Sequence, residues 1–359
     1  AAYKINVLHF HFSDDEAWRL EIPGLEELTA IGSRRGFTED ESQRLYPVYY
    51  GGWNPNDTTA TANGYYTRED FIEVLQYAAK RHITVIPEIE SPGHARAAIK
   101  AMEARFNRLK GEDMEKAREY LLSESADTSK YVSAQAYTDN IMNVALPSVY
   151  RFMDKVSDEI IKMYKDAGVP LATIHIGGDE VKYDQWKKSA QVRNFMKEQN
   201  IKTPADLQIW FTNTISHYLE SKKKHMMGWN EITGVKIHDY TDFEDAASGA
   251  SLAEGTIVHF WRGDPSLIKQ TVKKGYQVVN SYHEYTYLDY DTAYTSLEKA
   301  YHFDPLAGIT GKETDLIIGI GAQMWGEWIP TLSDMYRKLY PRIAAFAECG
   351  WTSPSNKSW

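Results

Sequence analysis

Cysteine is almost absent from this chain, which has a single one, Cys349, among 359 residues. One cysteine excludes an internal disulfide and a cysteine-based metal site. Long apolar runs are missing too, so the sequence offers no segment suited to a membrane-spanning helix. An excess of positive charge is also missing, and the net charge of −10 argues against a nucleic-acid backbone as partner.

Aromatic residues, by contrast, are abundant, with 10 Trp and 24 Tyr. Sugar-binding sites use aromatic rings, because the C–H faces of a pyranose are apolar. The chain is otherwise 43% hydrophobic and 25% charged, which is typical of a globular protein with a large core. The composition therefore allows carbohydrate as a class of partner.

Strand-like runs alternate with helical patterns along the chain, which favours a parallel α/β sheet. The runs are Ile5–Phe12, Ile83–Ile89, Ala172–Gly177, His225–Trp229, Thr256–Trp261, Tyr276–Ser281 and Leu316–Met324. Because seven runs are one short of eight, we expect an α/β fold, a (β/α)8 TIM barrel lacking its first strand and most of its first helix. A doubly wound open sheet is the alternative. It is disfavoured because no glycine-rich phosphate loop follows the first run.

The organisation predicted from the sequence is a single barrel domain over residues 1–359, truncated at its N-terminus. The opening "AAYKINVLHFHF" starts at the end of a helix, and the closing "TSPSNKSW" follows a helical pattern directly. Two connections, about residues 23–66 and 101–143, are long and irregular, and such loops are usually functional or mobile. We therefore expect a fragment of a longer natural protein.

Polar and aromatic side chains follow the ends of all seven runs, as in "HFHFSDDEAW", "PEIESPGHA", "HIGGDE" and "AQMWGEW". In a barrel these strand ends line one face, where barrel enzymes keep their active sites. In "HIGGDE", Asp179 and Glu180 follow a strand and two glycines. Two acids that merely open the next helix are the plain alternative. His175 within the strand and the glycines weaken that alternative, because a buried polar group needs a partner and glycines permit a tight turn.

Three blocks, "NVLHFHFSDDEAWRLEI", "YYTREDF…YAAKRHITVIPEIESPGHA" and "HIGGDEV", resemble in order and spacing those of the family 20 glycoside hydrolases, the β-N-acetylhexosaminidases. The similarity covers nearly the whole chain. It implies a catalytic domain that removes terminal non-reducing β-linked N-acetylglucosamine or N-acetylgalactosamine with retention. It also implies substrate-assisted catalysis, in which the acetamido oxygen of the substrate attacks the anomeric carbon to form an oxazolinium intermediate.

The resemblance implies roles for four catalytic residues. Glu180 would be the general acid and then the base for water, while Asp179 would accept the acetamido N–H and stabilise positive charge. His94 of "PGHA" would contact Glu180 and be braced by Asp14 of "SDDE", a helix cap being the alternative for this histidine. A general acid needs a raised pKa while its neighbour stays ionised, so we expect opposite protonation states for the two adjacent acids.

The sugar-binding residues that the resemblance implies lie at later strand ends: Trp229, Trp261, Trp325, Tyr287, Asp289 and Glu327. The tryptophans would enclose the acetamido methyl group and the sugar face, unless they pack in the core. The tyrosine would donate to the acetamido oxygen, and the two acids would bind outer hydroxyls, unless they are solvated loop acids. His175 would be a structural hydrogen-bonding residue beneath the acids. Glu90 stands where the family usually has aspartate and would lie behind the groups that touch substrate.

Two features of the resemblance concern the ends of the sugar. The family's first strand carries an arginine that binds the sugar hydroxyls, and no residue of this chain can be assigned to it. In the first long loop, Tyr50 to Trp53 are candidates for an aromatic platform under the next sugar.

Two alternatives stay open. His9 and His11 in "HFH" resemble the His-x-His pair of metal-dependent amidohydrolases, with further ligands available at Asp14, His175 and His259. Against this, tryptophans occupy strand ends where such a site needs more ligands. The other alternative is a non-catalytic glycan-binding barrel, which would use the same aromatic residues.

The partners expected from these arguments are carbohydrate, with no nucleic acid, no membrane span, no metal and no organic cofactor. The full-length protein is expected to be secreted, periplasmic or otherwise extracytoplasmic. The sequence does not indicate an oligomeric state.

Overall fold

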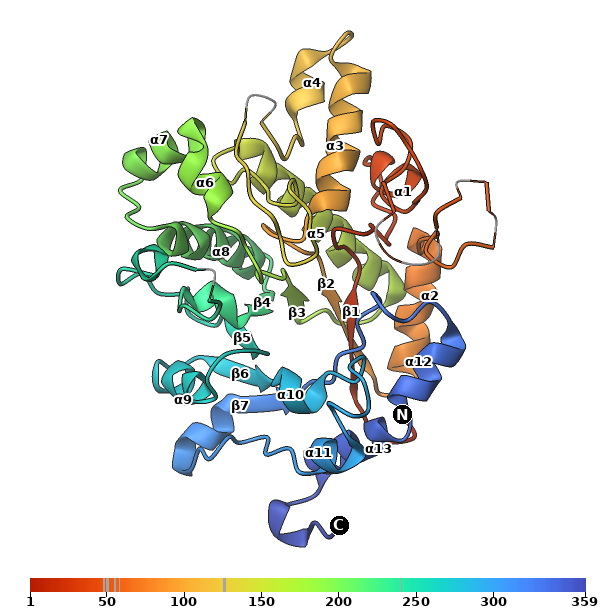
Figure 1. Cartoon of the computed structure of the whole chain (residues 1–359), viewed down its shortest axis with the longest axis vertical. Helices are drawn as coiled ribbons and strands as arrows, with labels where there is room; N and C mark the ends of the chain where they lie inside the picture. Colours follow the sequence, from red (N-terminus) through yellow and green to blue (C-terminus); the bar gives the residue numbers. More distant parts are fainter. Residues whose placement is uncertain (48, 50–51, 55, 58, 125–126, 240) are drawn as a thin grey trace. The chain divides into compact units, whose positions relative to one another are not determined.

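The strands and helices belong to two units of a computed structural model, which describes the chain except residues 48, 50–51, 55, 58, 125–126 and 240. One unit is Val7–Ala253, and the other combines Ala1–Asn6 with Glu254–Trp359. We call them the larger and the smaller unit. Figure 1 shows strands and helices alternating along the chain in both.

Four parallel strands run through the larger unit in chain order: β1 (Val7–His11), β2 (Thr84–Glu88), β3 (Thr173–His175) and β4 (His225–Trp229). The register pairs His11 with Glu88 and Glu88 with His175, so polar residues meet at one end of these strands. Parallel strands need crossover connections, usually helices, and such helices bury the strands on both faces. This burial explains the apolar runs of β2, β3 and β4, whereas Val7 and Leu8 of β1 are exposed.

The helices of the larger unit begin at recognisable signals. Thr67 caps α2 in a reciprocal capping box with Asp70, Pro147 opens α5, and Thr203 caps α8. Helix α5 packs against α2 and α8, while α2 contacts β2 and α8 contacts β4. The helices are α1 (Glu27–Ala30), α2 (Arg68–Ala79), α3 (Arg96–Leu109), α4 (Met114–Arg118), α5 (Pro147–Ala167), α6 (Asp184–Lys188), α7 (Ala190–Glu198) and α8 (Pro204–Ser221), with 3-10 turns η1 (Asn230–Thr233) and η2 (Phe243–Asp245).

The smaller unit has three parallel strands, β5 (Ile257–Phe260), β6 (Gln277–Asn280) and β7 (Ile317–Ile320). Phe303, Phe346 and Cys349 are buried together in its core. The Trp351 indole donates a hydrogen bond of 2.9 Å to the Lys4 carbonyl, which ties the N-terminal segment to α13. The helices are α9 (Ser266–Lys273), α10 (His283–Thr286), α11 (Leu297–Tyr301), α12 (Leu332–Leu339) and α13 (Arg342–Trp351), with 3-10 turns η3 (Gly311–Leu316) and η4 (Pro354–Asn356).

The predicted fold class is confirmed. All seven strands of the described residues lie within the runs predicted from the sequence, and their order follows the chain, as in a (β/α)8 barrel with one strand fewer. Among the described residues, no helix has the length and apolar character needed to cross a membrane. The assignment of 1–359 to one domain stays a prediction.

The prediction of an irregular segment over 101–143 is wrong in its first part, because α3 continues to Leu109 and α4 follows at Met114–Arg118. Helix α3 buries Ala97, Ala98, Ala101 and Met102, so its inner face is lined mainly with alanine. The irregular chain begins after Arg118. Of the proposed platform Tyr50–Trp53, residues 50 and 51 lie outside the described residues, and Trp53 is 54% exposed.

Candidate active site

The turn that carries the paired acids follows β3 in the larger unit. Gly177 and Gly178 have φ of +73° and +97°, and Glu180 also has a positive φ of +49°. A Cβ on Gly177 would clash with the Glu90 carboxylate, and one on Gly178 would clash with the Ile232 side chain. Both glycines are therefore required by close approach as well as by backbone conformation. A strained non-glycine residue such as Glu180 is typical of a functional site.

His94 joins the paired acids to a second acidic pair. Its Nε2 atom lies 3.4 Å from Glu180 Oε2 and 3.6 Å from Asp179 Oδ2. Its Nδ1 atom lies 3.3 Å from Asp14 Oδ1 and 3.2 Å from Asp15 Oδ2. The structure thus brings together Glu180, His94 and Asp14 as the sequence predicts. His94 has a φ of +46°, so its backbone is also held in an unusual conformation.

Asp15 was not identified from the sequence, although it is the more buried member of its pair, at 1% exposure. Its carboxylate accepts hydrogen bonds from the Asn140 amide at 2.9 Å and the Arg96 backbone N–H at 3.2 Å, besides contacting His94. The signal was present, because Asp15 is the second acid of "SDDE". Its partners, however, come from residues 94, 96 and 140, and such pairings are not visible in a sequence.

Charge around His94 sets the protonation of the site. Burial alone would lower the pKa of His94, but Asp14, Asp179 and the hydrogen bonds to Asp14 and Asp15 raise it well above its usual range. Burial would raise the pKa of Glu180, but its hydrogen bond to His94 and the histidine's charge lower it to about 2. Burial raises the pKa of Asp179 well above its usual range; His94 opposes this, and nearby carboxylates reinforce it.

These directions are the reverse of the predicted ones, in which Glu180 carries the raised pKa and Asp179 stays ionised. The physical reason lies in the neighbours of each acid: Glu180 hydrogen-bonds to His94 and lies near His238, whereas Asp179 is buried beside the carboxylates of Glu231 and Glu88. A cationic imidazole favours the ionised form of the carboxylate that it contacts. The protons of such a cluster belong to the group as a whole, so the imidazolium and Glu180 carboxylate can exchange one proton across their contact.

A buried layer of polar residues lies behind the turn, and Glu88 is its centre. Glu88 accepts from the Trp229 indole at 2.9 Å and lies 2.8 Å from His175 Nδ1 and 2.9 Å from His9 Nε2. His175 is fully buried and its Nδ1 also accepts from the Gly177 backbone N–H at 3.0 Å, with the pKa lowered to about 4 by burial. His175 is therefore a buried residue that hydrogen-bonds to the turn carrying the acids, and its structural role stays a prediction.

Glu88 was also missed at the sequence level, and here a usable signal existed. Alternate residues of a strand share a face, so Glu88 and Glu90 in "PEIE" belong together, as do His9 and His11. Glu90 is 2% exposed and lies 3.1 Å from His11 Nε2. Burial, together with Asp179 and Glu88, raises the pKa of Glu90 well above its usual range. Its carboxylate lies directly against Gly177, and its predicted place behind the groups that touch substrate stays a prediction.

Trp229 is the tryptophan of the larger unit for which sugar contact is predicted, and it is 1% exposed. Its indole N–H is engaged by Glu88, and its ring lies 5.0 Å from that of His175, centroid to centroid. The hydrogen bond fixes the direction in which the ring plane faces. The indole nitrogen of Trp229 therefore has a buried partner, as the nitrogen of a core tryptophan does. This holds whichever groups contact the face of the ring.

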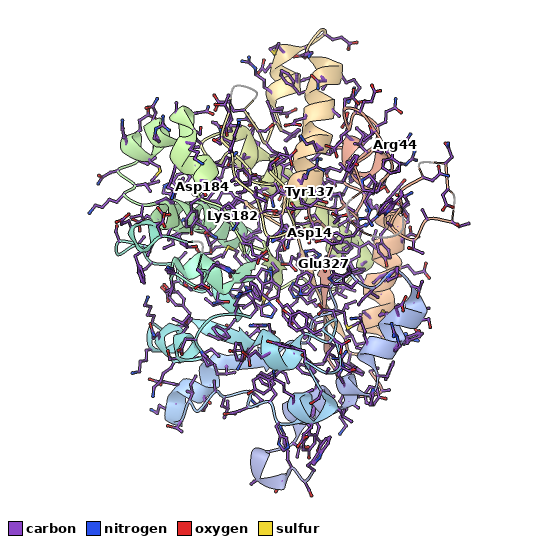
Figure 2. The ribbon with its side chains drawn as sticks, in the orientation of Figure 1. Asp14, Arg44, Tyr137, Lys182, Asp184 and Glu327 are labelled. Atoms are coloured by element: carbon purple, nitrogen blue, oxygen red, sulfur yellow. The ribbon has the colours of Figure 1, made fainter. Side chains whose placement is uncertain are left out.

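In the smaller unit, the predicted sugar-binding residues come together. The rings of Trp261 and Tyr287 stack with centroids 5.8 Å apart and planes 12° apart, and Trp325 lies 6.2 Å from Tyr287. Burial raises the pKa of Asp289 to about 7, and the negative charge of Glu327 adds to it. Asp289 Oδ1 is buried and has no hydrogen-bond partner among the described residues. Glu327, labelled in Figure 2, is partly buried.

Two clusters in the larger unit contain potential metal ligands within 4.8 Å of one another: His11, Glu88 and Glu90, and Asp14, Asp15 and His94. In both, a histidine nitrogen lies close to carboxylate oxygens, at 3.1 Å between His11 and Glu90 and at 3.2 Å between His94 and Asp15. These contacts involve some of the atoms that a metal would use. The absence of a metal stays a prediction.

A sequence profile described as "Glycosyl hydrolase family 20, catalytic domain" matches residues 1–354. Among curated relatives, a "Beta-hexosaminidase" of Vibrio vulnificus is 36% identical over 99% of this chain and 45% of its own length. "Beta-hexosaminidase B" of Pseudoalteromonas piscicida is 33% identical over 98% of this chain and 48% of its own. This chain thus spans about half the length of these relatives.

A solved structure with a similar fold is the exo β-N-acetylglucosaminidase of Vibrio harveyi in complex with N-acetylglucosamine. It is 33% identical, with a TM-score of 0.81 over 99% of this chain and 51% of that one. The likeness extends through all seven strands, because nearly the whole chain is covered.

Proposed function

Since the chain belongs to glycosyl hydrolase family 20, we propose that it acts as the catalytic domain of an exo-acting, retaining glycosidase for terminal β-linked N-acetylglucosamine or N-acetylgalactosamine. The names of the relatives support this class of substrate. Within this chain, the single observation that carries the proposal concerns the carboxylate of Asp179. Its Oδ1 atom is buried and has no hydrogen-bond partner among the described residues.

An acetamido N–H is the kind of group that Asp179 Oδ1 needs. A donor would stabilise the ionised carboxylate and lower a pKa that burial otherwise raises. The ionised Asp179 then holds the acetamido group so that its carbonyl oxygen attacks the anomeric carbon, and it stabilises the positive charge of the oxazolinium. Substrate binding thus brings Asp179 to the protonation state that the reaction requires.

Glu180 and His94 together supply the proton for the leaving oxygen. The imidazolium passes a proton to Glu180 across their contact, and Glu180 passes it to the glycosidic oxygen as the bond to carbon breaks. Asp14 and Asp15 hold the imidazole from its other side. In the second half of the reaction, Glu180 takes a proton from the water that opens the oxazolinium, which gives net retention.

The sugar-contact roles of Trp229, Trp261, Trp325, Tyr287, Asp289 and Glu327 stay predictions of the family resemblance. Trp261 and Tyr287 are held by their own stacking, so they present a preformed apolar surface of the kind that suits an acetamido methyl group. The extracytoplasmic location is also a proposal, because glycan polymers do not cross membranes and a glycosidase acts where they are. Cell fractionation with antibody detection tests it, and an exclusively cytoplasmic protein would contradict it.

The direct test is release of 4-nitrophenol from its β-N-acetylglucosaminide and, in parallel, from its β-glucoside. We expect turnover of the acetamido sugar alone, because the glucoside has no internal nucleophile. Glu180→Gln removes the proton donor, and Glu198→Gln, an exposed acid at the end of α7, is the control. Equal turnover of both sugars would contradict substrate assistance. Sugar binding without any turnover would instead favour the glycan-binding alternative.

A further inference from the structure

Gln135 contacts the paired acids from the irregular segment that follows Arg118. Its Nε2 atom donates a hydrogen bond of 3.2 Å to Glu180 Oε2. The residue lies between α4 and α5, far along the chain from Glu180 and outside every block that resembles the family. We propose that Gln135 binds the leaving sugar. Its amide N–H stabilises Glu180 once this residue is an ionised carboxylate, and its amide oxygen accepts a hydrogen bond from a hydroxyl of the departing sugar.

The backbone around Gln135 is built to hold it in place. The Ser133 N–H donates to the Tyr137 carbonyl at 2.7 Å, and the Tyr137 N–H donates to Ser133 Oγ at 3.0 Å, which closes a turn with Gln135 inside it. Ala136 adopts a φ of +67° within this turn. Tyr137 is buried, and its hydroxyl donates to a carboxylate oxygen of Glu16 (Tyr137 is labelled in Figure 2). Gln135 is thus carried by an anchored turn.

The hydrogen bond acts on one oxygen of the general acid. Gln135 Nε2 and His94 Nε2 both contact Glu180 Oε2, at 3.2 and 3.4 Å. The remaining oxygen, Oε1, is then the one that serves the glycosidic oxygen. The glycosidic oxygen joins the two sugars. A side chain that is hydrogen-bonded to the Glu180 carboxylate therefore lies within reach of the leaving sugar.

The chemistry of the step favours a donor at this position. As the anomeric C–O bond breaks, the proton moves from Glu180 to the leaving oxygen, the acetamido oxygen bonds to carbon, and negative charge appears on Glu180. Gln135 does not change its protonation; its N–H faces Oε2, which shares the charge that the carboxylate gains when Oε1 gives up its proton. The same hydrogen bond contributes to the lowered pKa of Glu180, after the opposing effect of burial and the effects of His94 and His238.

The other end of the amide is available for a ligand. Gln135 Oε1 is buried and has no hydrogen-bond partner among the described residues, and a buried acceptor without a donor is costly. A hydroxyl of the leaving sugar is a donor of the right kind. An aryl leaving group such as 4-nitrophenol offers no such hydroxyl and departs with little need of a proton.

That contrast gives the test, which rests on the proposed function. We expect Gln135→Leu to lower kcat/KM on N,N′-diacetylchitobiose by about 10- to 30-fold, while kcat/KM on 4-nitrophenyl β-N-acetylglucosaminide changes less than about 3-fold. Thr138→Ala, an exposed residue directly after the same turn, is the control and should leave both unchanged. Equal losses on both substrates would show a merely structural role and overturn the proposal, as would no loss on either.

A second measurement does not depend on turnover. In protein labelled with ¹³C at glutamate carboxyls, the titration of Glu180 should move to higher pH in Gln135→Leu, because a hydrogen bond to the ionised form is lost. An unchanged titration would overturn the proposal. Failure of the proposed function would have a different signature, since wild-type protein would then fail to distinguish the acetamido sugar from the glucoside while this titration still shifted.

Discussion

The turn at Asp179 and Glu180 and the aromatic group at Trp261 and Tyr287 are both buried, but different forces hold them. The turn depends on charge: one imidazole contacts four carboxylates, and each pKa in the group is moved by its neighbours. The aromatic group depends on ring contacts, with planes of Trp261 and Tyr287 only 12° apart. We therefore expect the first to respond sharply to single-atom changes and the second to respond weakly.

The difference also concerns the backbone. At the turn, two glycines and a positive φ at Glu180 leave no room for another conformation. In the aromatic group, Tyr287 has an extended backbone with φ of −78°, which any residue adopts. Of the two regions, the turn is therefore the one with left-handed backbone, and it is also the one for which proton transfer is proposed. The following changes test how far this contrast extends.

The largest effect is expected for Asp179→Asn. The change keeps the shape of the side chain but removes the charge that would stabilise the oxazolinium, so kcat for the acetamido sugar should fall by about 10²- to 10³-fold. Steady-state kinetics measures this, and Asp184→Asn on the following helix α6 is the control. A fall of less than about 5-fold would show that charge at this position is dispensable, and the contrast would fail.

Gly177→Ala should produce the largest loss of stability. Its Cβ would enter the space of the Glu90 carboxylate, and its φ of +73° disfavours a side chain, so we expect the free energy of unfolding to fall by about 3 kcal/mol. Gly168→Ala separates the two causes, because Gly168 has a similar φ of +69° and no described atom lies within 4 Å of an added Cβ. Urea unfolding of both variants gives the comparison. Equal losses would mean that the clash contributes nothing.

The strands could be predicted from the sequence because β-branched and apolar runs mark buried parallel strands directly. Helix α3 was missed because half of its buried residues are alanine and many of its exposed residues are charged, which resembles a solvated loop. Sequence periodicity weighs side-chain hydrophobicity, and alanine contributes little to it. The fold was therefore accessible wherever large apolar residues form the inner face.

In the site, the paired acids, His94 and Asp14 were predicted, since they belong to short motifs that resemble a known family. Asp15 and Gln135 were not, because each is identified by a partner that is distant in the chain, whereas Glu88 could have been placed with Glu90 by strand alternation. The direction of the pKa shifts was also missed, since it depends on which charged groups lie against each acid: His94 and His238 for Glu180, and several carboxylates for Asp179. These neighbours are set by tertiary packing.

Asp289 lets the aromatic region be tested by pH. Burial and the nearby charge of Glu327 raise its pKa to about 7, so between about pH 4 and 7 the folded state binds more protons than the unfolded state. The contribution of Asp289 to stability therefore falls as pH rises through this window, by up to about 1.4 kcal/mol per pH unit. Asp289→Asn should remove that contribution.

Urea unfolding of wild type and variant at pH 5 and pH 8 measures it. The stability of Asp289→Asn relative to wild type should be greater at pH 8 than at pH 5. Asp291→Asn, an exposed acid two residues further on, is the control and should show no such difference. A difference that is the same at both pH values would show that Asp289 does not titrate between them.

The smallest effect is expected for Tyr287→Phe. The substitution removes only the hydroxyl predicted to hold the acetamido oxygen, and it keeps the ring that stacks on Trp261. The loss of one uncharged hydrogen bond is worth about 1 kcal/mol, which corresponds to a fall in kcat of about 5- to 10-fold with little change in stability. Tyr290→Phe, whose ring lies 5.3 Å from that of Tyr287, is the matched control. If Tyr287→Phe reduced activity as severely as Asp179→Asn, hydroxyl positioning would matter as much as charge, and the two regions would no longer differ in the way their chemistry suggests.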